Sequence, residues 1–353
     1  MRSIQLTALH AMQQVDVPKP ELTRPGDVRI RVACVGVCGS DVHYYSTGHI
    51  GSQVVQYPFV VGHELAGTIE RAGSDVHNLH PGDRVAVDPA MPCFACDQCR
   101  LNRRHTCRNL RFLGCPGQAG GCLCDYIVMP ASSCLLLPRG CTLEQGALIE
   151  PLAIGAYTVR LAGDLRGQCV GILGCGPIGL SVLLAARQAG ASRIYVIDPI
   201  AGRRRFAQKC GAVWSGEPDA QAIADILQQE PLAMDTVFEC CGQQQALDQC
   251  VELLKPGGRL MLVGITRTER VSFSIDLLRR REIVIQNVRR QNACDHAGAA
   301  LLSSYPELTA AMVTHRFPVE QTQAAFDLTE AYRDNVIKAM IWFERFNPIP
   351  AYR

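Results

Sequence analysis

Hydrophobic and polar residues follow one pattern up to about residue 150. Residues 28–32 alternate with period two, and residues 65–70 and 84–87 form further short runs typical of strands. Pro-Gly and Gly-Asp pairs separate these runs, as in Pro25-Gly26-Asp27 and Pro81-Gly82-Asp83. Short strands with such turns predict a β-rich barrel or sandwich.

A different pattern begins after about residue 153. Continuous apolar runs typical of buried strands alternate with segments of helical periodicity. The expected strands are 169–173, 193–197, 235–239 and 259–263, and the expected helices are 177–189, 203–210, 219–229 and 243–254. This alternation predicts an α/β domain with a parallel sheet covered by helices on both faces.

The βα rhythm stops at about residue 290. Residues 295–303 and 319–331 predict helices, and residues 337–342 predict a last strand. We expect this segment to return to the first domain, so that residues 1–153 and 290–353 form one domain and residues 154–289 the other. The tail, residues 346–353, carries no pattern that predicts structure.

A glycine-rich loop links the first strand of the second pattern to its helix. Residues 174–179 fit the pattern G-x-G-x-x-G, in the strand–loop–helix context that dinucleotide binding requires. The first glycine permits the tight turn, the second lets backbone approach the pyrophosphate, and the third lets the helix pack against the strand. The helix N-terminus then offers N–H groups to the phosphates. The candidate contacts are Gly174, Gly176, Pro177, Ile178 and Gly179.

Asp198 ends the second expected strand, 24 residues after Gly174. Its carboxylate can accept hydrogen bonds from the ribose hydroxyls and would repel a 2′-phosphate, which favours NAD over NADP. The neighbouring arginines 203–205 complicate this choice, because Arg203 could bind that phosphate; otherwise the run would be a solvated face. A plain helix N-cap is the structural alternative for Asp198.

Four cysteines lie within 15 residues in the spacing C-x2-C-x2-C-x7-C. They are Cys93, Cys96, Cys99 and Cys107. Four thiolates on short loops suit a closed, tetrahedral zinc site, which leaves no position for a substrate and is therefore structural. Chance clustering and an iron–sulfur site are the alternatives.

A catalytic metal needs fewer protein ligands and one open coordination position. Cys38, His63, Glu64 and Glu150 are the residues of suitable type. They are scattered along the chain, and a lone histidine or cysteine is more often structural, so their spacing alone leaves this site open.

Composition narrows the classes of function. The net charge of +2 does not favour nucleic acid or an anionic membrane as a partner. We find no long uncharged apolar run and no secretory signal at the N-terminus, and we expect a cytoplasmic protein. Eighteen cysteines in 353 residues is high, but disulfide scaffolds are normally much shorter, and several of these cysteines lie singly in apolar runs.

Seven segments, in order along nearly the whole chain, carry a resemblance to one family. They are residues 38–44 (CGSDVHY), 48–51 (GHIG), 62–64 (GHE), 147–152 (ALIEPL), 174–179, 255–258 (KPGG) and 313–318 (VTHRFP). The chain resembles the medium-chain zinc alcohol dehydrogenases, and closely their sorbitol (polyol) dehydrogenase branch. The resemblance implies a GroES-like β-rich catalytic domain interrupted by a Rossmann domain, which is a doubly wound parallel sheet.

The resemblance also implies roles for individual residues. Cys38, His63 and Glu64 would hold a catalytic zinc, with water completing the shell, and Glu150 would lie beside the metal and could exchange with that water. The four cysteines would hold a structural zinc, giving two zinc ions per chain. Ser40 and His43 resemble the relay that carries the alcohol proton to solvent, and Tyr44 would line the substrate pocket.

The resemblance has one departure, in residues 288–292. The polyol branch has an aromatic residue after an arginine in this segment; here Arg290 keeps the arginine, but Gln291 replaces the aromatic. We therefore expect an NAD-linked oxidation of a secondary hydroxyl in a polyol-like small molecule, without assuming sorbitol.

Other readings remain open beside this one. A related enzyme could act on L-threonine or on an anionic sugar acid, for which Arg289-Arg290 is a suitable basic pair. A zinc-ribbon regulatory or nucleic-acid-binding protein and a zinc-free reductase are further alternatives. The family forms homotetramers or homodimers, often through edge strands of the Rossmann sheets, and residues 270–275 alternate as such an edge strand would.

Overall fold

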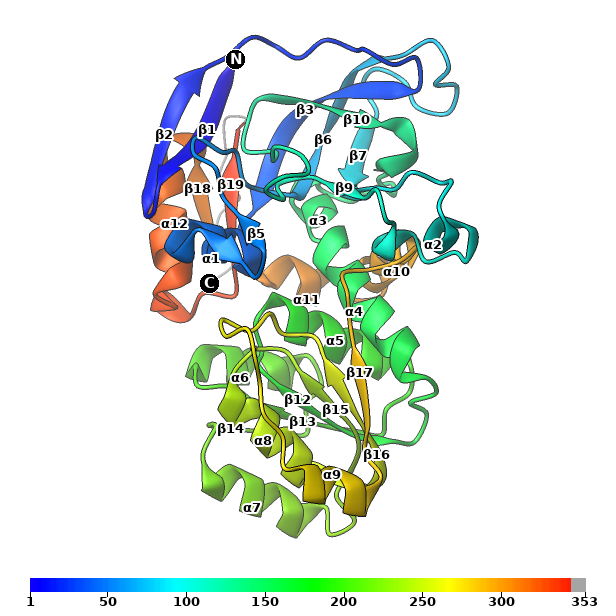
Figure 1. Cartoon of the computed structure of the whole chain (residues 1–353), viewed down its shortest axis with the longest axis vertical. Helices are drawn as coiled ribbons and strands as arrows, with labels where there is room; N and C mark the ends of the chain where they lie inside the picture. The colour runs from blue at the N-terminus through cyan, green and yellow to red at the C-terminus, as the bar shows by residue number, and fades with distance from the viewer. Residues whose placement is uncertain (344–353) are drawn as a thin grey trace. The chain divides into compact units, whose positions relative to one another are not determined.

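The structure is a computed structural model, and it describes residues 1–343. The chain divides into two compact units, residues 1–150 with the segment from 313 onward, and residues 151–312 (Figure 1). The sequence-based division placed residues 290–312 in the first domain, whereas the structure groups them with the second unit. The reason is packing, because Cys294 clusters with Ala153 and Tyr157 of the second unit.

A seven-stranded sheet organises the first unit. Its order is β11-β7-β6-β3-β19-β18, and β10 pairs with β3 beside this path. The strands are β3 (Asp27–Gly36), β6 (Glu64–Ala72), β7 (Arg84–Val87), β10 (Tyr126–Pro130), β11 (Cys134–Leu136), β18 (Val313–Pro318) and β19 (Lys338–Trp342). Thus β19, from the end of the described chain, pairs with β3 from its beginning.

Short elements complete the first unit. The pairs are β1 (Arg2–Ala8) with β2 (Ala11–Asp16), β4 (His49–Ile50) with β5 (Gln53–Val54), and β8 (Ala90–Met91) with β9 (Arg111–Phe112). The helices are α1 (Gly39–Thr47), α2 (Asp97–Arg100), α3 (Leu143–Ala147) and α12 (Thr322–Glu330). One hydrophobic core runs through strands and helices alike, and residues such as Ile30, Leu65, Phe326 and Ile341 are at most 1% exposed.

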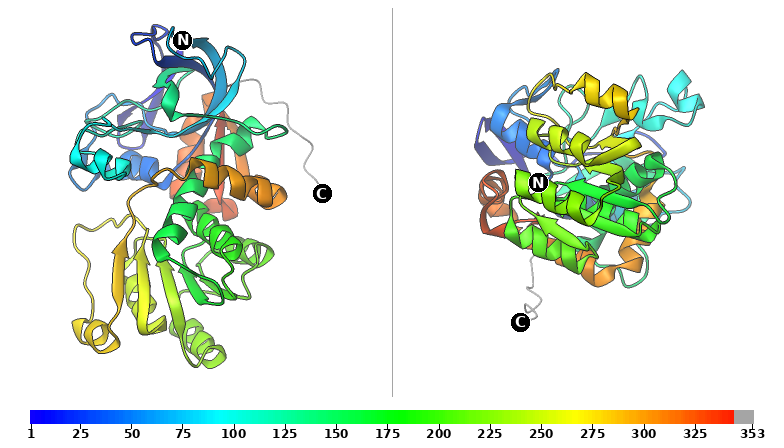
Figure 2. Two further views of the ribbon diagram at one scale, coloured as in Figure 1. Left: turned by 90° about the vertical axis from the view of Figure 1, so that its right-hand side faces the viewer. Right: turned by 90° about the horizontal axis from the view of Figure 1, so that it is seen from below.

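A six-stranded, all-parallel sheet organises the second unit, in the order β14-β13-β12-β15-β16-β17. The strands are β12 (Cys169–Leu173), β13 (Arg193–Ile197), β14 (Trp214–Gly216), β15 (Met234–Glu239), β16 (Leu254–Leu262) and β17 (Val284–Asn287). Helices lie on both faces of this sheet, as expected (Figure 2). They include α5 (Pro177–Gln188), α6 (Ala201–Lys209), α7 (Ala220–Gln229), α8 (Gln244–Leu253) and α9 (Ile275–Arg281).

Three more helices come before the first or after the last strand of this sheet along the chain. They are α4 (Ile149–Ala162), which begins at the boundary between the units, α10 (Asp295–Ser304) and α11 (Pro306–Ala311). Alternate residues of the strands face opposite sides, as the side-chain period of two requires. On one side, Tyr195 and Val237 pack with Ile226 of α7 and Cys250 of α8.

The expectation of a strand at residues 270–275 is wrong. Residues 270–274 form no strand, and α9 begins at Ile275. The side chain of Gln244 takes the place of a partner strand, since it donates to the Ser272 carbonyl and accepts from the Ser272 N–H. Ser274 then caps α9 by accepting from Leu277 N, and the edge of the sheet is β17 instead.

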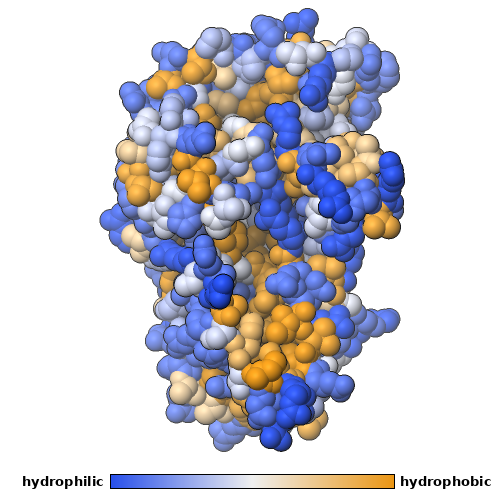
Figure 3. All heavy atoms as spheres, in the orientation of Figure 1, coloured by the Kyte–Doolittle hydropathy of each residue, from blue (hydrophilic) through white to orange (hydrophobic). Residues whose placement is uncertain are grey.

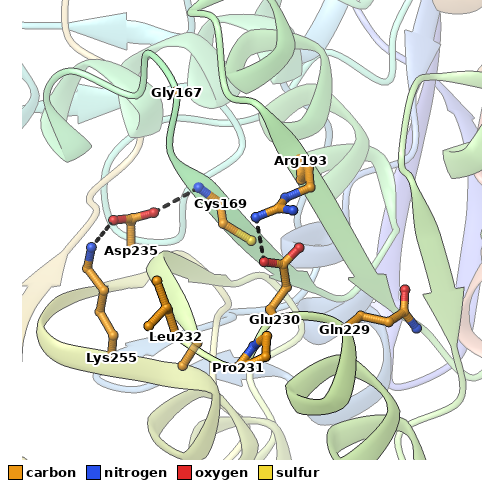
Figure 4. Close-up of a pocket in the computed structure, with 10 residues that line it drawn as sticks. Gly167, Cys169, Arg193, Gln229, Glu230, Pro231, Leu232, Asp235 and Lys255 are labelled. Atoms are coloured by element: carbon orange, nitrogen blue, oxygen red, sulfur yellow. Dashed lines mark hydrogen bonds and ion pairs between the residues drawn. The ribbon is translucent and has the colours of Figure 1, made fainter.

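A hollow of about 250 Å³ lies in the second unit at the amino ends of β12, β13 and β15 (Figure 4). Its charged side chains are already paired, Arg193 with Glu230 and Lys255 with Asp235. The glycine-rich loop follows the carboxyl end of β12, at the opposite edge of the sheet, where ligands of such sheets bind. This hollow is therefore not the dinucleotide site.

Among residues 1–343, no helix has both the length and the apolar character needed to cross a bilayer. The cytoplasmic location stays a prediction.

Candidate functional site

The first candidate metal site lies in the first unit, where β3 and β6 are antiparallel neighbours. Gly36, at the end of β3, is the Cα partner of Glu64, at the start of β6. Cys38 follows β3 and His63 precedes β6, so this pairing brings Cys38 to the adjacent residues His63 and Glu64, from which it is distant in sequence. One ligand atom from each of Cys38, His63 and Glu64 lies within 4.8 Å of the other two.

Asp41 orients the imidazole of this group. Its fully buried Oδ1 lies 3.3 Å from His63 Nδ1 and accepts a hydrogen bond from Gly62 N at 3.1 Å. A carboxylate on one ring nitrogen leaves the other nitrogen to face a metal. Burial alone would lower the pKa of His63, but Asp41 and Cys38 raise it well above its usual value. The surroundings of His63 therefore favour a positive charge.

Glu150, in the first turn of α4, is a fourth acidic group near this site. Burial raises the pKa of its carboxyl to about 8, Glu64 raises it further, and His63 opposes the shift. Its Oε2 is buried and has no hydrogen-bond partner within the described part of the chain. A buried, unpartnered carboxylate oxygen requires an explanation, and a neighbouring cation or its water is a suitable one.

These residues fit a divalent metal of the zinc type. One thiolate, one imidazole and one carboxylate are the usual zinc donors, and three protein ligands leave a coordination position open for a substrate. The arrangement can therefore hold a metal that polarises a substrate oxygen.

Helix α1 carries the predicted proton-relay residues and Tyr44. The Ser40 hydroxyl donates to Cys38 Sγ at 3.3 Å, so it lies beside a candidate metal ligand. His43 follows three residues later on the same helix face. The relay itself stays a prediction.

Tyr44 is only 4% exposed, and its surroundings add two residues that the sequence did not indicate. Its hydroxyl donates to Gln53 Oε1 at 3.1 Å and lies 4.0 Å from Cys115 Sγ. Neither residue stands in a recognisable pattern, because only the folded chain brings them to Tyr44.

Lys338, on β19, is a third residue that the sequence analysis missed. Its side chain is 1% exposed, and its ammonium donates to Glu64 Oε2 at 2.5 Å and to the Val37 carbonyl at 3.0 Å. A lysine inside the apolar run 337–342 is a signal that could have drawn attention to it, since lysines are rarely buried without a partner.

The four clustered cysteines form the second candidate metal site, around α2. Their sulfur atoms all lie within 4.8 Å of one another. Cys107 Sγ lies 3.5 Å from Cys93 Sγ and 3.8 Å from Cys96 Sγ. These separations exceed the ~2.05 Å of a disulfide. They match the edge of about 3.8 Å that a tetrahedron with Zn–S bonds of ~2.3 Å has.

Backbone hydrogen bonds favour the deprotonated form of two of these thiols. N–H groups of Ala95 and Cys96 lower the pKa of Cys93 to about 6, and those of Arg108 and Cys99 lower the pKa of Cys96. Burial instead raises the pKa of Cys99 to about 12. A metal that binds thiolates would supply the charge that the buried member needs.

Two glycines of the glycine-rich loop in the second unit, Gly174 and Gly179, have the geometry that the pattern predicts. Gly174 has φ 97°, a conformation that favours glycine. A Cβ on Gly179 would lie 1.8 Å from the Gly174 carbonyl oxygen, so only glycine lets α5 approach the loop this closely. Gly176 is the N-cap of α5, and Pro177 is its first residue, followed by Ile178. The loop therefore presents a helix N-terminus to a phosphate.

Asp198 lies directly after β13 and is 3% exposed. Its Oδ2 accepts from Cys175 N at 2.6 Å, inside the glycine-rich loop, and its Oδ1 accepts from Ile200 N at 2.8 Å. Arg203 is 6% exposed rather than solvated, and its guanidinium lies near Gly176. The structure thus brings the loop, the acidic residue and this arginine together.

Arg290, the predicted substrate contact, lies between β17 and α10 in the second unit and adopts a left-handed φ of 53°. Its role stays a prediction. The neighbouring Gln291 has a structural task, since its carboxamide accepts from Cys294 N at 2.8 Å and donates to Asp295 at the start of α10.

Comparisons with known proteins identify the family of this chain. Residues 24–139 match the family model of the alcohol dehydrogenase GroES-like domain, and residues 177–304 match that of the zinc-binding dehydrogenase. Sorbitol dehydrogenase from Bacillus subtilis is 32% identical over 351 residues, covering 98% of each chain. L-idonate 5-dehydrogenase from Vitis vinifera is 35% identical over 324 residues, covering 90% of this chain and 88% of the relative.

Solved structures show the same fold. An oxidoreductase/dehydrogenase of unknown specificity from Escherichia coli superposes with a TM-score of 0.90 at 31% identity, covering 97% of this chain and 98% of the other. A zinc-binding dehydrogenase from Sinorhizobium meliloti, bound to NADP, gives 0.85 at 27% identity over the same shares. The chain is a dehydrogenase of the medium-chain, zinc-binding alcohol dehydrogenase family and groups with its sorbitol dehydrogenase-like members.

Proposed function

We propose that this protein oxidises a secondary hydroxyl of a polyol or sugar-derived substrate to a ketone, with zinc and NAD. The observation that carries the proposal is the convergence of Cys38, His63 and Glu64, which can hold a metal and leave one coordination position open. The relatives named sorbitol dehydrogenase and D-xylulose reductase support a polyol as the substrate class.

Two zinc ions per chain would occupy the two clusters. Cys38, His63 and Glu64 would hold the catalytic ion, with Glu150 beside it, and the four cysteines the structural one. Bound zinc supplies Lewis acidity toward the substrate hydroxyl, and bound NAD supplies the hydride acceptor.

The chain itself moves the proton that oxidation releases. Loss of two electrons and two protons converts the alcohol to a ketone, and one proton must reach solvent when the hydride leaves. Ser40 Oγ, which lies beside Cys38, would accept this proton while passing its own to the His43 ring one turn along α1. Tyr44, oriented by Gln53, would bind the substrate's other hydroxyls.

An anionic sugar acid is the second candidate substrate. The relative named L-idonate 5-dehydrogenase favours it, as does the basic pair Arg289-Arg290, which could pair with a carboxylate. A substrate panel of sorbitol, xylitol, an aldonate and L-threonine separates the two candidates, since the polyols should be turned over fastest if our proposal is right.

NAD is the favoured dinucleotide. The buried carboxylate of Asp198 stands where it can accept from ribose hydroxyls and repel a 2′-phosphate. Arg204, which follows Arg203 on α6, donates hydrogen bonds to the Asp198 carbonyl and to the Glu217 carboxylate, so it is not free to bind that phosphate.

We also propose that the protein is a homodimer or homotetramer that uses β17. Among residues 1–343 this strand is an edge of the parallel sheet and pairs only with β16, so its other backbone side can add a strand. Val284 on β17 and Ile275 on α9 are 51% and 75% exposed. Figure 3 shows apolar residues over β17 and the segment that precedes α9. A second copy related by a twofold axis would bury this surface and extend the sheet.

Cys38→Ser should abolish turnover of every alcohol in the panel, by roughly 10³-fold or more, because it removes a ligand of the metal that activates the hydroxyl. NAD binding, measured by calorimetry, should stay within about threefold of the unaltered chain, since the glycine-rich loop is untouched. Cys134→Ser, which alters a thiol outside both clusters, is the control. Substantial activity in Cys38→Ser would refute the catalytic assignment.

Cys107→Ser should reduce the zinc content from two ions to one per chain, because Cys107 contacts both Cys93 and Cys96. The free energy of unfolding should fall by several kcal/mol, on the order expected for loss of a structural zinc site. Elemental analysis and chemical denaturation measure these effects. Iron in place of zinc in the unaltered chain would contradict the assignment.

We expect the unaltered chain to prefer NAD over NADP by about tenfold or more in kcat/KM. Asp198→Asn should reduce this preference. The amide removes the charge that repels a 2′-phosphate while keeping one oxygen to accept from the loop. Steady-state kinetics with both dinucleotides checks this, with Asp219→Asn, which alters the N-cap of α7, as control. An unaltered chain that prefers NADP would overturn the cofactor proposal.

Val284→Lys should shift the protein to a smaller assembly, because a charge on the edge strand opposes pairing with a second copy. Light scattering coupled to size-exclusion chromatography gives the molar mass. Leu232→Lys, at an 84% exposed position in the loop before the central strand β15, is the matched control. An unchanged mass would exclude β17 as the contact.

A further inference from the structure

A fully buried lysine lies beneath the candidate catalytic metal site. Lys338 is 1% exposed, as is its partner Glu64, and three strands enclose the pair, β3, β6 and β19. Its ammonium is satisfied by Glu64 Oε2 at 2.5 Å and by the Val37 carbonyl at 3.0 Å. A buried cation needs such partners, because an unpaired charge in the interior costs several kcal/mol.

The position of this pair depends on the absence of a side chain at Gly36. A Cβ on Gly36 would lie 2.3 Å from Glu64 Oε2, 3.3 Å from Glu64 Cβ and 3.4 Å from Lys338 Cδ. The φ of Gly36 is not in the left-handed region, so its backbone does not need glycine. Glycine is needed here because the Glu64 carboxylate and the aliphatic part of Lys338 occupy the space that a side chain would take.

The same carboxylate is one of the three candidate metal ligands. Glu64 offers one oxygen to the group formed with Cys38 and His63, while its Oε2 accepts from Lys338. Cys38 and Glu150 also act electrostatically on Lys338, so the ammonium faces three groups that bear negative charge when ionised. Lys338 thus interacts with groups that a metal at this site would also contact.

We infer that Lys338 is a positioning residue that shares the Glu64 carboxylate with the catalytic metal and limits how tightly this metal is held. The inference rests on the proposed function, since it needs a metal at Cys38, His63 and Glu64. Two cations that approach one carboxylate repel each other and divide its negative charge. A metal that keeps more of its own charge is also the stronger Lewis acid toward a substrate oxygen.

A purely structural lysine would behave differently. If Lys338 only neutralises a buried carboxylate, its loss would destabilise the chain with and without metal, and would leave the intrinsic zinc affinity unchanged. If it shares Glu64 with the metal, its loss frees the carboxylate for zinc. Affinity should then rise, and the stability gap between the zinc-loaded and zinc-free chains should widen.

The test compares the unaltered chain, Lys338→Met and Lys338→Arg, each loaded with zinc and titrated with a chelator. We expect Lys338→Met to bind the more labile zinc equivalent at least tenfold more tightly, and Lys338→Arg to lie within about threefold of the unaltered chain because the cation is kept. Lys255→Met is the matched control, because it removes a lysine paired with Asp235 far from both clusters in sequence. Unchanged or weaker zinc affinity in Lys338→Met would overturn the inference.

Gly36→Ala gives an independent variant in case Lys338→Met does not fold without metal. The added methyl group must displace the Glu64 carboxylate while leaving the lysine charge in place, so zinc affinity should fall at least tenfold. An affinity equal to that of the unaltered chain would contradict the role of this packing. If the unaltered chain holds zinc only at the four cysteines, the proposed function itself fails, whereas a second zinc that Lys338→Met leaves unchanged refutes the inference alone.

Discussion

The antiparallel pairing of β3 with β6 is the constraint on which the candidate catalytic site depends. Cys38 and His63 are 25 residues apart, and the register that sets Gly36 opposite Glu64 brings them within reach of one ion. Because side chains alternate along a strand, a slip of one residue would turn Glu64 to the other face of the sheet. The buried core on β3 and β6 fixes this register. Hydrophobic packing, rather than the ligand residues themselves, therefore sets the geometry of the candidate metal site.

The sequence predicted the second unit better than the first. Strands such as β12 and β13 are short, mainly apolar runs, and such runs are recognisable from the sequence alone. The exception was residues 270–275, where alternation alone could not show that the Gln244 side chain would replace a partner strand. The sequence also could not show that α10 belongs to the second unit, since this depends on the packing of Cys294.

The two candidate metal clusters show the same contrast between local and tertiary information. The four-cysteine cluster was evident from spacing, because all its ligands lie in one short segment. The second cluster was proposed from a family resemblance, since only the fold joins its ligands. Gln53 was missed because the hydrogen-bond partner of a tyrosine leaves no pattern in the chain. Lys338 was missed because only the fold pairs it with Glu64, although its place in an apolar run is a signal.

The double use of Asp198 has a consequence for how a dinucleotide would bind. By accepting from Cys175 N, this carboxylate ties the glycine-rich loop to the end of β13. A loop already held in this way loses little conformational freedom when a ligand arrives, so less of the binding free energy is spent on ordering it. Association of a dinucleotide should accordingly require little rearrangement of the backbone at this point.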